Sequence, residues 1–114
     1  MLDPGPAKKV TIHLNEDTGS RSDFLSNEII ALLLKQGVAG ATLLRPEAGF
    51  GTHHRVHSGE RGSDTAQHMP LRIEFIDTVQ NVERFLPALQ ELVTDGLIEV
   101  QDTVILKVAI GTSR

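Results

Sequence analysis

The residues best suited to chemistry lie in one short stretch, GFGTHHRVH, which runs from Gly49 to His57. Two glycines flank an aromatic residue, and three histidines and an arginine follow within five positions. Glycine permits the close approach and the unusual dihedral angles that a nest of backbone amides around an anion requires. Imidazole is a ligand for zinc, copper or nickel. The stretch therefore allows a phosphate cradle, a metal site or a solvated polar loop.

The metal hypothesis depends on the histidines of this stretch, His53, His54 and His57. A pair with His-x3-His spacing meets on one face of a helix, but the glycines disfavour a helix there. Because the chain has no cysteine, a closed site would need ligands from a neighbouring subunit, such as His68 or Glu60. A metal site therefore stays an alternative, beside the simpler interpretation that these are solvated loop side chains.

A phosphate site would add side chains to the backbone amides. Arg45 lies at the end of a predicted strand beside the loop, where its guanidinium could form a bidentate pair with a phosphate. It could equally form a surface ion pair with Glu47. His53 and Arg55 follow the glycines closely enough to reach the same anion, or to be solvated. These three side chains are the candidate contacts.

Composition limits the partners and the compartment. A chain of 114 residues fits one domain with one core. Its net charge of -4, with four Phe and no Trp or Tyr, argues against binding nucleic acid or an anionic membrane. Without cysteine it has no disulfide and no thiolate nucleophile. Because no apolar run could span a bilayer and prolines interrupt the N-terminal region, we expect a cytoplasmic protein.

Hydrophobic periodicity predicts the elements that position these residues. Strands are expected over residues 8–15, 41–45 and 71–76, followed by a last strand in two pieces, 97–100 and 104–110, bent at Gln101 and Asp102. Helices are expected from Ser20 to Gly37 and over 78–94, the second capped by Asp77. Pro87 should kink or divide the second helix. The segments without periodicity give a tail at 1–7, a domain at 8–110 with a mobile loop at 48–69, and a tail at 111–114.

The order strand, helix, strand, strand, helix, strand is typical of the α+β ferredoxin-like fold, in which two helices cover one face of an antiparallel sheet. We expect the face toward the helices to carry Val10, Ile12, Leu14, Leu71, Ile73 and Phe75. The opposite face would carry Thr11, His13, Arg72, Glu74 and Ile76. Because the run VILKVAI is apolar at nearly every position, the last strand would expose Val and Ile there unless another subunit covers them.

Three runs, GATLLRPEAGFGTHHRVH, PLRIEFIDT and VERFLPALQELVTDGLIEV, resemble the PII-like family known as domain of unknown function 190, within the nitrogen regulatory PII superfamily. The similarity extends from about Lys8 to Lys107. It implies a homotrimer with inward-facing sheets, nucleotide clefts between subunits, a mobile loop and a signalling role rather than an enzymatic one. It also implies that the amides of Gly49, Phe50 and Gly51 approach the ligand phosphates, and that His53 follows the ligand.

The chain departs from PII in ways that bear on the ligand. It has no tyrosine, so uridylylation of a loop tyrosine cannot operate. The turn 94–96 lacks the lysine that helps hold a triphosphate in PII, and Lys107 and Arg114 are the only late cations. We therefore expect AMP, ADP or a cyclic nucleotide as effector rather than ATP. Members of the family are often encoded near fluoride-export channels, which implies a membrane transporter or channel as partner.

Two other functions remain as alternatives. One is a trimeric metal-binding protein that uses the loop histidines. The other is a small phosphate hydrolase, although no oriented nucleophile and base are visible, since Ser58 beside His57 is only a pair of sequence neighbours. We assign no catalytic residue and predict that the protein is not an enzyme.

Overall fold

The structure is a computed structural model that describes residues 2–14, 20–45, 48–49, 57–58 and 71–111. Two helices and six strands are placed in these ranges. In chain order they are β1 (Gly5–Leu14), α1 (Ser20–Lys35), β2 (Thr42–Leu44), β3 (Ala48–Gly49), β4 (His57–Ser58), β5 (Leu71–Thr78), α3 (Val79–Leu92) and β6 (Gly96–Ile105).

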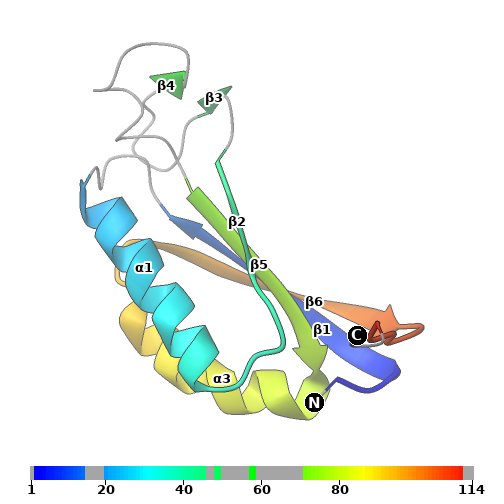
Figure 1. Cartoon of the computed structure of the whole chain (residues 1–114). Coiled ribbons are helices and arrows are strands. Elements are labelled where there is room, and N and C mark those ends of the chain that lie inside the picture. The colour runs from blue at the N-terminus through cyan, green and yellow to red at the C-terminus, as the bar shows by residue number, and fades with distance from the viewer. Residues whose placement is uncertain (1, 15–19, 46–47, 50–56, 59–70, 112–114) are drawn as a thin grey trace.

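The main sheet has four strands in the order β2-β5-β1-β6, and every neighbouring pair is antiparallel. Both helices lie on the same face of this sheet (Figure 1). The order places the first and third strands of the βαββαβ sequence at the centre and the second and fourth at the edges. The predicted ferredoxin-like α+β fold is confirmed.

The predicted alternation of the strands is also confirmed. Val10 lies opposite Phe75 on β5, and Ile12 lies opposite Ile73. Directly opposed residues of an antiparallel pair share a face, so these side chains form one apolar layer against the helices. The helices contribute the other half of the core. The buried apolar cluster comprises Val10, Ile12, Leu14, Ile29, Leu33, Val38, Leu71, Ile73, Phe75, Val82, Phe85 and Leu89.

The face of the sheet away from the helices carries charged residues together with the exposed apolar residues Ile76 and Leu97. Arg72 and Glu74 lie on it beside His13, and Glu99 lies opposite Thr11. The sequence predicts exposed Val and Ile from the run VILKVAI on this face. Ile105 lies opposite Gly5 and Val104 lies opposite Pro6, so the two residues of this run inside β6 lie on opposite faces of the sheet. Val100 lies opposite the buried Val10, so it belongs to the helix side, where it stays exposed because the core lies over β1 and β5.

Helix α1 ends as its sequence predicts. Gly37 has φ +82°. The amide of Val38 donates to the carbonyl of Leu33 at 3.1 Å, and the amide of Gly37 donates to the carbonyl of Leu34 at 3.2 Å. These two bonds form a Schellman motif, and Val38 and Leu33 share the core cluster. Glycine stops the helix because it adopts this left-handed conformation at low cost.

Helix α3 differs from its prediction at two points. The N-cap is Thr78, whose hydroxyl accepts from the amide of Asn81 at 3.3 Å, whereas Asp77 is buried one residue earlier and accepts from the Thr78 amide at 2.7 Å. The helix is also not divided at Pro87, which lies inside it. Proline removes only one helical donor, and the buried Phe85 and Leu89 on either side anchor both halves to the same core.

Strand β1 begins earlier, and β6 runs more continuously, than the sequence suggests. β1 begins at Gly5, three residues before the predicted start, because Gly5 pairs with Ile105 at the end of β6. β6 runs unbroken through the predicted bend, where Gln101 and Asp102 stay in register with β1. Residues 106–110 lie beyond the strand. The ends of β1 and β6 are set by hydrogen-bonded pairing between the two strands. The hydrophobic periodicity of one strand alone does not reveal this pairing.

Candidate functional site

The candidate site lies at one end of the sheet. Arg45 directly follows β2, and Leu44, one residue before it, pairs with Arg72 near the start of β5. The segment between these strands therefore leaves and rejoins the sheet at the same end (Figure 1). Leu14 at the end of β1 lies opposite both Leu71 and Gly96, so the turn before β6 is at the same end.

A short antiparallel ladder brings the ends of the GFGTHHRVH stretch together. Ala48 of β3 pairs with Ser58 of β4, and Gly49 pairs with His57. The first glycine of the stretch and its last histidine are therefore neighbours. Sequence analysis missed this ladder, because two-residue strands are too short to show a period of two.

The structure places only some of the predicted contact residues. Arg45 is exposed at the end of β2, and Gly49 lies in β3. The other predicted phosphate contacts, Phe50, Gly51, His53 and Arg55, lie outside the described residues, as does most of the predicted mobile loop 48–69. The structure thus brings Arg45 and Gly49 to one end of the domain, and the roles of the others stay predictions.

The metal alternative has one residue in the described part of the chain. His57 lies in β4, whereas His53, His54, Glu60 and His68 fall outside it. In the ranges that the structure describes, no three His, Asp or Glu residues form a group that could hold a metal ion. The hypothesis therefore depends on the segment between Gly49 and His57.

The turn from α3 to β6 is held very close to β1. Gly96 has φ +150°, and a Cβ at this position would lie 2.2 Å from the carbonyl oxygen of His13. Only glycine fits here without a backbone shift. The turn 94–96 is therefore short and tightly packed against β1.

The two halves of the candidate site are far apart within one chain. Arg45 follows β2 at one edge of the sheet, and the turn 94–96 precedes β6 at the other edge. Three strand spacings separate these edges, or about 14 Å. A ligand that contacts both segments of one chain would have to bridge this distance.

Ion pairs cover the open face of the sheet. Glu74 forms ion pairs with two cations, at 3.2 Å from the Arg72 Nε and 3.9 Å from the Lys9 Nζ. Glu99 lies 3.3 Å from the His13 Nε2 and accepts from the Gln101 side-chain amide at 3.4 Å. The face therefore has one more cation than carboxylate around Glu74, and it has the Glu99 carboxylate on β6. Such opposite charges can attract the same face of a second copy of the chain.

A further ion pair lies between the neighbouring strands β1 and β6, away from the candidate site. The Lys8 Nζ donates to Asp102 Oδ1 at 2.6 Å. This hydrogen bond, together with the positive charge of Lys8, lowers the pKa of the Asp102 carboxyl below its usual value. Asp102 is exposed, so the pair tethers β1 to β6 at the surface.

Comparison with known proteins identifies the family. Residues 7–105 match the family model of domain of unknown function 190, described as Uncharacterized ACR. The chain belongs to this family. The DUF190 chain is 29% identical to the UPF0166 protein MJ1524 of Methanocaldococcus jannaschii over 105 residues, which is 89% of this chain and 93% of the relative.

Solved structures with the same fold are PII-like. The nitrogen regulatory PII-like protein CPII of Thiomonas intermedia K12, bound to ADP, AMP and bicarbonate, is 21% identical with a TM-score of 0.63, and 94% of each chain is covered. The protein TTHA0516 of Thermus thermophilus, described as PII-like, is 22% identical with a TM-score of 0.65 over 92% of this chain and 94% of the other. These likenesses establish that the DUF190 chain has the PII-like fold. Among its described residues no helix is both long and apolar enough to cross a membrane.

Proposed function

We propose that this protein is a PII-like sensor that binds a small adenine nucleotide between the subunits of a homotrimer. The observation that carries the proposal is the position of Arg45 and Gly49 in a PII-like fold, at the start of the predicted loop 48–69, which we call the loop mouth. The structure of CPII, which shares this fold, is bound to ADP, AMP and bicarbonate. The separation of the loop mouth from the turn 94–96 supports a site completed by a second subunit.

In the proposed mechanism, the amides of residues 49–51 and the guanidinium of Arg45 hold the phosphate, with His53 or Arg55 as a further contact. Glycine at positions 49 and 51 lets the backbone approach the anion closely. AMP, ADP or a cyclic nucleotide suits the site better than ATP, because the turn 94–96 supplies no lysine. No side chain is required to act as nucleophile or base, so the protein is a sensor and not an enzyme.

Ligand binding would then order the loop 48–69 and change the surface that the chain presents to a partner protein. A nucleotide shifts this equilibrium only as far as it binds one loop conformation better than the other. A membrane transporter or channel is the partner that the family association favours. The net charge of -4 gives no reason to propose nucleic acid.

Isothermal titration calorimetry with AMP, ADP, ATP and cyclic AMP tests the proposal. We expect micromolar binding of AMP, ADP or cyclic AMP, weaker binding of ATP, and loss of heat in Gly51→Asp, which puts a carboxylate at the phosphate. Absence of heat with all four nucleotides would refute the proposal. Sedimentation equilibrium measures the trimer independently.

The metal alternative has its own test. A variant with His53, His54 and His57 all changed to alanine would lose stoichiometric zinc or copper binding if these residues form a metal site. The position of His57 directly opposite Gly49 is the observation that keeps this alternative. Hydrolysis of a nucleotide or an acyl phosphate, abolished by a single substitution, would instead support a phosphate hydrolase.

A further inference from the structure

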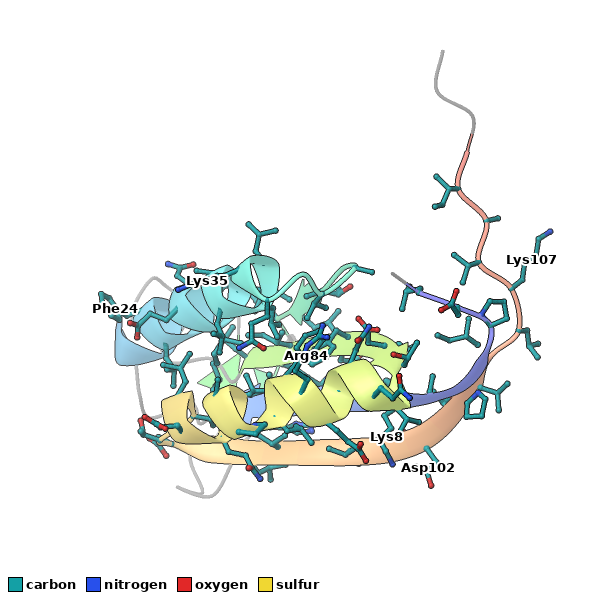
Figure 2. The ribbon with its side chains drawn as sticks, turned by 90° about the horizontal axis from the view of Figure 1, so that it is seen from below. Lys8, Phe24, Lys35, Arg84, Asp102 and Lys107 are labelled. Carbon is teal, nitrogen blue, oxygen red and sulfur yellow. The ribbon has the colours of Figure 1, made fainter. Side chains whose placement is uncertain are left out.

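The chain continues past β6 as an apolar arm, Leu106–Gly111, that its own domain does not cover. The relative exposure of Leu106 is 88% and that of Ile110 is 82%. In Figure 2 this segment runs away from the sheet and helices beyond Lys107. Two large apolar side chains held in water on a projecting segment indicate a surface that another molecule covers.

An apolar groove of about 200 Å³ lies at the opposite side of the domain, where α1 ends and the chain turns toward β2. Leu34 at its rim has a relative exposure of 77%. The lining residues in the described part of the chain are all aliphatic or glycine; they are Ile30, Leu33, Leu34, Val38, Ala39, Gly40 and Ala41. The Schellman motif at Gly37 fixes the shape of this groove.

A second groove, between α1 and α3, is a poorer match for the arm. It measures about 350 Å³ and is lined by Leu32, Ala88, Glu91 and Leu92. Burying an apolar anchor there would desolvate the Glu91 carboxylate without giving it a partner. The groove at the end of α1 carries no such penalty.

The arm and the α1 groove belong to opposite edges of one sheet. The groove leads into β2 and the arm leaves β6, and these are the two outer strands. Different complementary surfaces on opposite sides of a subunit form head-to-tail contacts, which close into a ring when the rotation permits. Six extended residues span up to about 20 Å, enough to reach an adjacent subunit.

We propose that the arm of each subunit binds in the α1 groove of the next subunit, with Leu106 and Ile110 as its apolar anchors. The inference rests on the proposed homotrimer and adds the contact that links one subunit to the next. It brings the arm beside β2, the strand that ends next to Arg45. The contact between arm and groove would then contribute to the free energy of trimer association, together with the open face of the sheet.

Disulfide cross-linking between two differently tagged chains tests this contact. The chain has no native cysteine, so Leu34→Cys on one chain and Ile110→Cys on the other provide the only thiols. After the two variants are co-expressed, purified and oxidised, we expect a heterodimer on a non-reducing gel. The matched control replaces Leu34→Cys by Glu83→Cys, which is exposed on α3 outside the groove. A trimer that cross-links no better than this control would overturn the proposal.

A second experiment measures the contribution of the anchors. The double variant Leu106→Ser/Ile110→Ser should raise the dissociation constant of the trimer at least about tenfold in sedimentation equilibrium. Lys107→Ser, in the same arm, should leave it unchanged. Equal association of the double variant and the wild type would overturn the arm contact alone. A wild-type chain that sediments as a monomer would overturn the trimer as well, and the nucleotide titration would still stand as a separate test.

Discussion

Gly96 lies against the backbone of His13 so closely that a Cβ on Gly96 would be 2.2 Å from the His13 carbonyl oxygen. The contact joins the turn after α3 to the centre of the sheet, at the end where β1 also reaches the candidate site. Both groups at the contact are backbone, so no side-chain rotation can relieve it.

Gly96→Ala is therefore expected to destabilise the protein by about 2 to 4 kcal/mol, since the methyl group must displace backbone at a positive φ. Urea denaturation measures the loss. Gly40→Ala is the matched control, because a Cβ added at Gly40 would have nothing within 4 Å, and it should change the free energy of unfolding by less than about 0.5 kcal/mol. Equal stability of the two variants would contradict the close contact.

Thr78→Ala should lower the free energy of unfolding by about 1 kcal/mol, because it removes the acceptor for the Asn81 amide at the start of α3. Thermal unfolding would show this as a loss of about 4 °C. Thr78→Ser keeps the hydroxyl and serves as the control. If alanine and serine behave alike, the hydroxyl does not cap the helix.

Asp77→Ala should cost more than the loss of the cap, about 2 kcal/mol or above. Its buried carboxylate accepts from both the Thr78 amide at 2.7 Å and the Asn81 side-chain amide at 2.8 Å. The substitution leaves two donors without this acceptor. Urea denaturation of Asp77→Ala beside Thr78→Ala checks the order, and a smaller loss for Asp77→Ala would count against this network.

The Lys8–Asp102 pair should add a small stabilisation that depends on pH and salt. Because Lys8 lowers the pKa of Asp102 in the folded chain, the stabilisation is complete above the ordinary value of 3.8 and is lost as pH falls through the lowered value. Asp102→Asn should therefore lower the Tm slightly at pH 7. The difference should vanish in about 1 M salt, where the Debye length is about 3 Å. A difference that persists there would exclude the ion pair as its source.

Arg45→Ala is expected to weaken AMP binding roughly tenfold to a hundredfold, the usual consequence of losing a charge-assisted hydrogen bond. Calorimetry measures the change. Arg84→Ala is the matched control, since Arg84 lies on α3 with its guanidinium 5.1 Å from the centre of the Phe85 ring, away from the loop mouth. Unchanged affinity in Arg45→Ala would remove this residue from the phosphate site.

The sequence determined the repeating parts of the molecule. The period-two pattern of Val10, Ile12 and Leu14 predicted which face of β1 is buried, and the apolar stripe of α3 predicted its packed side. Gly37 marked the end of α1 because glycine adopts the left-handed conformation of a helix stop at low cost. Such features depend on neighbours along the chain, which the sequence displays directly. Gly96 does not stop the second helix, because α3 ends at Leu92 and Gly96 begins β6.

The tertiary structure decided the features that depend on distant partners. Gly5 becomes a strand residue only because Ile105 lies beside it, and Gly49 meets His57 only through a ladder of two residues. Pro87 stays inside a helix because the core holds the turns on both sides. These outcomes follow from pairing and packing energies between segments far apart in sequence, and local periodicity carries no record of them.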